Sequence, residues 1–142
     1  MAKATYSVTI KRPVEEVFSF LEVGENNLRW RPGVMDIKRV AGLGVGAKFV
    51  QGVTGPMGRR IAADYVVMAI EDNRRLSFET VAGPVRPRGR YDLVPVDDGT
   101  LLTFSLVAEL HGLRGFLLNS RVQTTMDAEV RNLDNLKRVM EA

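Results

Sequence analysis

Few side chains in this sequence could do acid–base chemistry. His111 is the only histidine, and there is no cysteine, which excludes a thiol nucleophile, a disulfide and a thiolate metal site. Histidine titrates near neutral pH and is the first candidate for a general acid or base. No Ser, Asp or Glu can be placed beside it from the sequence, and its position between a strand and a helix is equally typical of an exposed structural residue. We expect no metal site.

Two tyrosines, Tyr65 and Tyr91, lie in predicted strands and could orient a ligand carbonyl or hydroxyl through their phenols. Packing in the core with the hydroxyl at its rim is the alternative. Four strand carboxylates could form an acid–base pair, but strand alternation favours the solvent face for most of them: Asp64, Glu79, Asp92 and Glu109. The catalytic candidates are therefore Tyr65, Tyr91 and His111, and they form no recognisable catalytic constellation.

Three arginines, Arg86, Arg88 and Arg90, alternate along one strand. Such a stripe can bind phosphate, but it is more typical of a solvated sheet face with counter-charges. The glycine-rich segment 42–46 lacks the following helix that a phosphate loop requires. The net charge is only +3, with both signs mixed along the chain, so we expect no nucleic-acid partner.

The bulk composition is that of an ordinary globular domain. Of the 142 residues, 45% are hydrophobic and 26% charged, which predicts one domain over residues 1–142. We find neither a signal peptide nor an apolar run long enough to span a bilayer. These features predict a cytoplasmic protein without membrane insertion and with no cofactor.

The elements that must position these residues follow from hydrophobic periodicity. Residues 4–11 alternate as a half-buried strand, and Pro13 then begins a short helix that ends at Gly24. A second short helix ends at Trp30. Six further strands are predicted at 34–40, 47–54, 60–70, 75–82, 88–96 and 100–110.

One long amphipathic helix is predicted at 114–141. The short links between the strands favour consecutive antiparallel hairpins, which gives a seven-stranded antiparallel sheet. Its apolar face needs a cover, and the final helix is the only element long enough to provide one. The sequence therefore predicts an α+β helix-grip fold, in which a curved sheet wraps around the C-terminal helix.

Four local patterns accompany this order of elements: PVEEVF at 13–18, WRPGV at 30–34, GVG at 44–46 and DGT at 98–100. Together they resemble the START-like helix-grip superfamily, specifically its polyketide cyclase/dehydrase and lipid-transport branch. The resemblance covers nearly the whole chain. It implies a fold with a ligand cavity, but its members include carriers, cyclases and protein-binding modules, so it does not decide the activity.

The mouth of such a cavity is expected at the end of the sheet with the looser connections, 55–59, 83–87 and 111–113. The two short helices are expected to run back to that end, together with Trp30. There Trp30 could stack on a ligand or pin the helices to the sheet.

Strand alternation indicates which side chains line the cavity. For Tyr65 and Val67, where both strand faces carry apolar residues, the inward orientation is implied by the family resemblance. The expected ligand-binding residues are Trp30, Tyr65, Val67, Phe78, Tyr91, Leu93, Phe104, Phe116, Met126 and Val130.

Three functions fit this pattern. The first is a carrier or sensor that binds a hydrophobic small molecule, whether lipid-like, polyketide-like or aromatic. The second is an enzyme resembling polyketide cyclases and dehydratases, which would use the same cavity with Tyr65, Tyr91 and His111 assisting proton transfer. The third is a protein-interaction module. The chain could be a monomer, or a homodimer formed through an edge strand.

Overall fold

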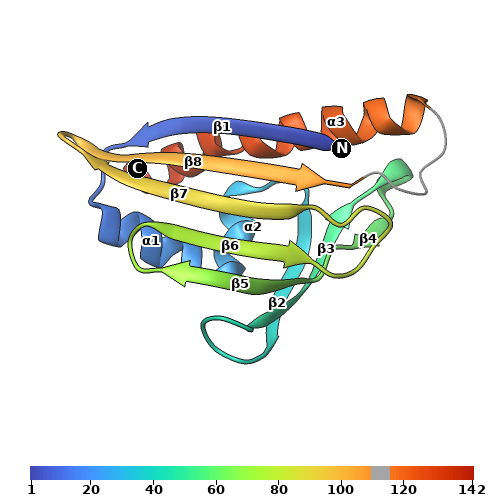
Figure 1. Ribbon diagram of the computed structural model, residues 1–142, viewed down its shortest axis with the longest axis horizontal. Helices are drawn as coiled ribbons and strands as arrows, with labels where there is room; N and C mark the ends of the chain where they lie inside the picture. Colours follow the sequence, from blue (N-terminus) through green and yellow to red (C-terminus); the bar gives the residue numbers. More distant parts are fainter. Residues whose placement is uncertain (110–115) are drawn as a thin grey trace.

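The structure is a computed structural model that describes residues 1–109 and 116–142, with the side chains of all but 116–119. The strands are β1 (Ala2–Ile10), β2 (Val34–Ala41), β3 (Lys48–Thr54), β4 (Arg60–Ala62), β5 (Tyr65–Glu71), β6 (Arg75–Thr80), β7 (Arg88–Val96) and β8 (Gly99–Ala108). The helices are α1 (Val14–Glu22), η1 (Gly24–Asn26), α2 (Asn27–Trp30), η2 (Pro56–Gly58), α3 (Phe116–Arg131) and α4 (Leu133–Glu141). This arrangement confirms the predicted α+β helix-grip fold (Figure 1).

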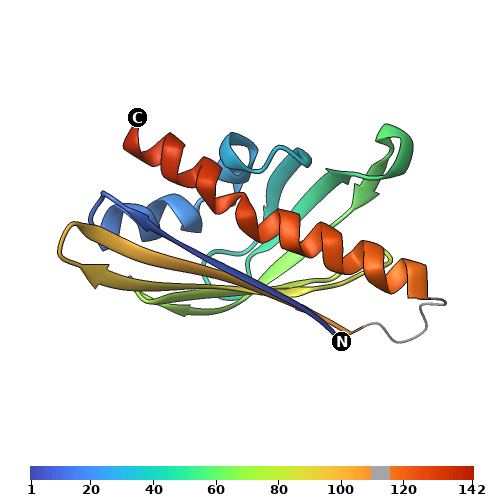
Figure 2. The same cartoon turned by 90° about the horizontal axis from the view of Figure 1, so that it is seen from above.

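The strands form a curved antiparallel sheet in the order β1-β8-β7-β6-β5-β3-β2, with β4 attached to β3. Pairing of β1 with β8 brings the first strand beside the last, so β1 and β2 form the two edges of this path. The C-terminal helix lies across one face of the sheet, and the shorter helices lie beside it (Figure 2). In the described part of the chain, no helix is long and apolar enough to cross a membrane.

The predicted strand 60–70 is two strands, which gives eight strands where seven were expected. β4 pairs with the end of β3 and β5 with its beginning, so the chain bends between them. At the bend, Ala63 donates its N–H to the Gln51 carbonyl at 2.8 Å, and Asp64 accepts the Gln51 N–H at 3.2 Å. The interruption is therefore a corner of the sheet, held to β3 through Gln51.

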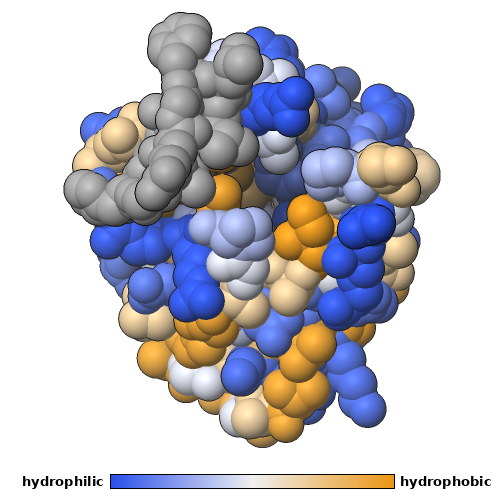
Figure 3. Space-filling model, turned by 90° about the vertical axis from the view of Figure 1, so that its right-hand side faces the viewer, coloured by the Kyte–Doolittle hydropathy of each residue, from blue (hydrophilic) through white to orange (hydrophobic). Residues whose placement is uncertain are grey.

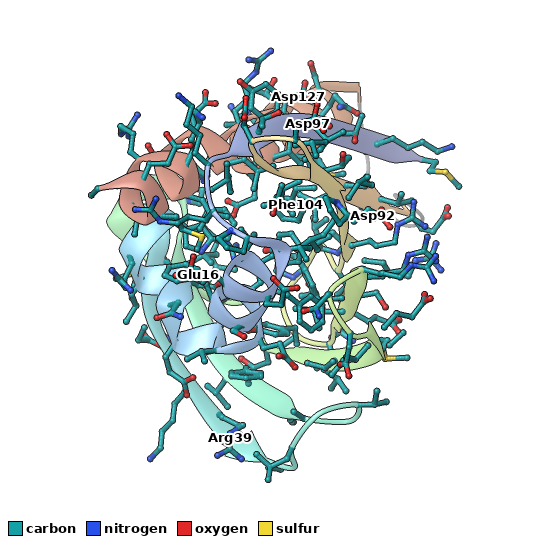
Figure 4. All side chains as sticks on the ribbon, turned by 90° about the vertical axis from the view of Figure 1, so that its left-hand side faces the viewer. Glu16, Arg39, Asp92, Asp97, Phe104 and Asp127 are labelled. Carbon is teal, nitrogen blue, oxygen red and sulfur yellow. The ribbon has the colours of Figure 1, made fainter. Side chains whose placement is uncertain are left out.

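The predicted strand alternation is confirmed in the last strand of the sheet. In β8, Leu102, Phe104 and Leu106 are buried, whereas the residues between them are half-buried. Seen from the end of the sheet that carries α1, Phe104 lies inside the curve (Figure 4). Trp30 packs edge-on against Phe104, with ring centroids 6.2 Å apart, and against Tyr91 at 6.3 Å.

The C-terminal helix is nearly continuous, as predicted, with one irregular turn at Asn132. There the Asn132 N–H donates to the Glu129 carbonyl and the Asn135 N–H to the Asn132 carbonyl, a tighter spacing than that of an α-helix. The buried residues of this helix pack on the sheet: Met126, Val130, Leu133 and Leu136. At its polar edge, the Tyr6 hydroxyl donates to the Asp134 carboxylate at 2.9 Å.

Candidate functional site

A cavity of about 560 Å³ lies between the short N-terminal helices and the curved sheet. Four aromatic rings from β3, β5, β6 and β7 line its wall: Phe49, Tyr65, Phe78 and Tyr91. Phe49 and Tyr65 are stacked at 4.9 Å between centroids, and Phe78 lies 5.3 Å from Tyr65. The aliphatic side chains of Leu21, Val67, Ile70 and Leu76 complete the wall.

The cavity opens between α1–η1 and the tip of the β2–β3 hairpin. Two exposed apolar side chains mark this opening, Val23 at 51% and Leu43 at 78% relative exposure. Arg39 lies near the hairpin tip (Figure 4), and its backbone N–H donates to the Glu25 carboxylate at 3.1 Å. This hydrogen bond connects the two sides of the opening.

The predicted position of the mouth is wrong. In the antiparallel register Ile10 lies opposite Thr100, so β1 ends beside the tight β7–β8 hairpin and α1 begins there. α1 therefore lies at the opposite end of the sheet from loops 55–59 and 83–87, with α2 near the middle (Figure 1), and neither loop contributes a described lining residue. The loop end shows hydrophilic and hydrophobic residues interspersed in its coloured part (Figure 3).

Four of the residues predicted to bind ligand line this cavity: Tyr65, Val67, Phe78 and Tyr91. Five others are buried in the core and are not among its described lining residues: Trp30, Leu93, Phe104, Met126 and Val130. Trp30 is 2% exposed and lies behind Tyr91, so it does not stand at the mouth. His111 lies outside the described residues, and so does the side chain of Phe116.

The floor of the cavity is polar, a feature that the sequence analysis missed. Arg31, which follows α2, is buried and forms an ion pair with Glu129 of α3. Its Nη1 also donates to Gln51 Oε1 at 3.3 Å, and the Asn27 amide donates to the same oxygen at 3.3 Å. Arg31 and Asn27 line the cavity, whereas Gln51 and Glu129 hold Arg31 in place.

Burial controls the protonation of the polar groups around this floor. Loss of hydration raises the pKa of the Tyr65 and Tyr91 phenols well above its usual value, although the Arg31 guanidinium opposes the shift. Burial also opposes the charge on Arg31, but interactions led by the Glu129 carboxylate outweigh it, so the pKa of Arg31 is raised. At neutral pH the floor therefore presents two protonated phenols and a charged guanidinium, all hydrogen-bond donors.

The charged residues on the outer face of the sheet do not join the site. Asp92 accepts hydrogen bonds from Arg75 at 2.8 Å and from Arg90 at 2.7 Å. The arginine stripe is thus interrupted by a counter-charge, as expected of a solvated face. In the described residues no cluster of three or more histidines, aspartates or glutamates could hold a metal ion.

A curved antiparallel sheet that grips a C-terminal helix defines the helix-grip class of proteins. Within that class, residues 1–141 match the family described as polyketide cyclase / dehydrase and lipid transport, and the chain belongs to this family. No curated protein matches the chain.

Solved structures agree on the fold. A protein of Thermus thermophilus has a TM-score of 0.82 at 23% identity, with 96% of this chain and 94% of that chain covered. A START superfamily protein of Mycobacterium smegmatis has a TM-score of 0.78 at 18% identity, covering 99% and 98%. The di-domain ARO/CYC StfQ from the steffimycin biosynthetic pathway has a TM-score of 0.80 at 12% identity, covering 99% of this chain and 50% of that one. At these identities the likeness concerns the fold alone.

Proposed function

We propose that this protein binds a hydrophobic small molecule, lipid-like, polyketide-like or aromatic, as a carrier or sensor. The observation that carries the proposal is the cavity of about 560 Å³ with four aromatic rings on its wall and a few polar groups on its floor. Small-molecule sites have this size and composition, since apolar walls supply affinity and few polar groups fix orientation. The aromatic wall favours a flat, ring-containing molecule over a thin acyl chain, because rings stack on rings.

A second function, a cyclase-like enzyme, is favoured by the donors on the cavity floor. Arg31, Tyr65 and Tyr91 could together hold and polarise a carbonyl of a folded polyketide chain. The protonated phenols act as donors rather than bases, so their contribution would be orientation and carbonyl activation. A place for His111 in this chemistry stays a prediction from the sequence.

Native mass spectrometry of the protein purified from its own host, followed by denaturing extraction, tests the binding proposal. We expect a bound apolar compound that is released on unfolding. Val67→Phe adds volume to the wall and should reduce the bound fraction, whereas Val94→Phe adds the same volume at a 52% exposed site on β7 and should not. An empty protein that also binds no hydrophobic probe would contradict the proposal.

A further inference from the structure

The one charged side chain on the floor of the cavity, among the described lining residues, is already neutralised by the protein. Arg31 and Glu129 form an ion pair with side-chain exposures of 10% and 22%. Arg31 lines the cavity and Glu129 stands behind it, so the pair presents a donor to the ligand without a net positive charge. A buried pair of this kind stays favourable only while the two charges remain matched.

A ligand carboxylate would disturb this balance. It would place a second anion beside Arg31, and one negative charge would remain uncompensated in a poorly hydrated site. A neutral carbonyl adds no charge that would need a partner. A guanidinium has five N–H donors, of which Glu129 and Gln51 engage Nε and Nη1, and the Tyr91 phenol lines the same space.

The entrance does not favour anions either. Glu22, Glu25 and Arg39 line the outer part of the cavity, which gives two carboxylates against one guanidinium. The Arg39 guanidinium is also engaged, since it donates to the Gly42 carbonyl at 2.6 Å. Partial burial, with a smaller contribution from the charge of Asp72, raises the pKa of Glu22.

From this arrangement we infer that the cavity selects electrically neutral molecules that carry a hydrogen-bond acceptor, such as a ketone, and discriminates against carboxylates of the same size. The inference rests on the proposed function, because it assumes that the cavity binds a small molecule. It excludes free fatty acids and aromatic acids as preferred ligands.

Calorimetric titration with two probes on one three-ring frame, fluorenone and fluorene carboxylate, tests this selectivity near neutral pH. We expect fluorenone to bind at least about tenfold more tightly, since a like charge beside Glu129 is disfavoured. Equal binding, or a preference for the carboxylate, would overturn the inference while leaving the proposed function intact. If neither probe binds, the inference fails, and native mass spectrometry of the protein from its own host decides the proposed function separately.

The variant Glu129→Gln tests the cause of this selectivity directly, because it leaves the Arg31 charge unpaired. We expect its affinity for fluorene carboxylate to rise about tenfold, with fluorenone binding changed by no more than about threefold. Asp127→Asn removes the same charge from an exposed site on the same helix and should leave the ratio as in the parent protein. A folded Glu129→Gln protein with an unchanged ratio overturns the inference. If that variant does not fold, the ratio measured on the parent protein decides.

Discussion

The ion pair of Arg31 and Glu129 connects two helices, and its arginine also lines the cavity. It joins the residue that follows α2 to Glu129 in the last turn of α3, 98 positions away in the chain. Such a contact adds little net stability relative to an apolar pair, but breaking it from one side leaves a buried charge without a partner. The same residues thus orient the floor of the cavity and fix the short helix against the long one.

Replacing Arg31 by Met should lower the free energy of unfolding by about 2–4 kcal/mol, because Glu129 then stays largely buried and unpaired. The double variant Arg31→Met with Glu129→Met should recover most of this loss. Urea unfolding measures both values.

Arg60→Met is the matched control, since it breaks an ion pair with Asp36 whose side chains are 41% and 51% exposed. Its cost should stay within about 1 kcal/mol. Equal losses from the two single variants would show that Arg31 behaves as a surface residue.

For individual residues, the sequence predicted part of the cavity wall but not the polar residues of its floor. Tyr65, Phe78 and Tyr91 lie on strands, where period-two alternation separates inward from outward side chains. Arg31 follows a helix of four residues, too short to show a periodicity. Its partners Gln51 and Glu129 are distant in sequence, so only the folded chain brings them to it. The Trp30–Gly33 pattern marked the segment but gave no sign that its arginine is buried.

Among the elements, η1 packs directly against two rings of the aromatic wall. Gly24 at its first position is buried against the aromatic wall. A Cβ placed there would contact the Phe49 ring and stand 2.5 Å from the Tyr65 hydroxyl oxygen. Glycine is required at this point by close approach of the helix to the wall, not by an unusual backbone conformation.

We expect Gly24→Ala to push the Phe49 and Tyr65 side chains into the cavity. Over-packing of this kind costs about 1–3 kcal/mol, and it should also weaken binding of fluorenone. Thermal unfolding and calorimetry measure the two effects. Gly33→Ala is the control, because nothing lies within 4 Å of its added Cβ, and it should change stability by less than about 0.5 kcal/mol. Similar losses in both variants would argue against the close approach.

The errors in the predicted elements have one physical cause. Local pattern located the strands, but it could not show that the end of β3 pairs with β4 and its beginning with β5. This change of pairing at Gln51 divides the predicted strand 60–70 into two. Local pattern also could not show that Ile10 pairs opposite Thr100, which sets the end of the sheet where α1 begins. Both are long-range registers, and register depends on tertiary pairing as well as on alternation.

For the molecule as a whole, the three tyrosines predict a loss of stability in alkali. Burial raises the pKa of Tyr65 and Tyr91, and a hydrogen bond to Asp134 raises the pKa of Tyr6. In the unfolded chain these phenols ionise near pH ~10. The unfolded state therefore releases protons first, and the free energy of unfolding falls as the pH rises above that value.

Urea unfolding at several pH values from about 9 to about 11, with tyrosinate absorption recorded in parallel, measures this dependence. Native protein should show little tyrosinate until it unfolds. Tyr91→Phe removes one of the three contributions and should make the alkaline slope shallower. A parent protein whose phenols all ionise near pH ~10 without unfolding would contradict the raised pKa values.

The hydrogen bond from the Arg39 backbone to Glu25 spans the opening of the cavity and bears on the rate of exchange. Under the proposed function, a ligand would pass between η1 and the β2–β3 hairpin, where exposed residues line the cavity. That passage requires this contact to break for a moment, whichever direction the molecule travels. The contact would then slow entry and exit alike. If it re-forms once the molecule is inside, it is present in both the free and the bound protein and contributes nothing to the binding free energy. Residence time and affinity are then set by different residues, the first by the rim and the second by the wall and floor.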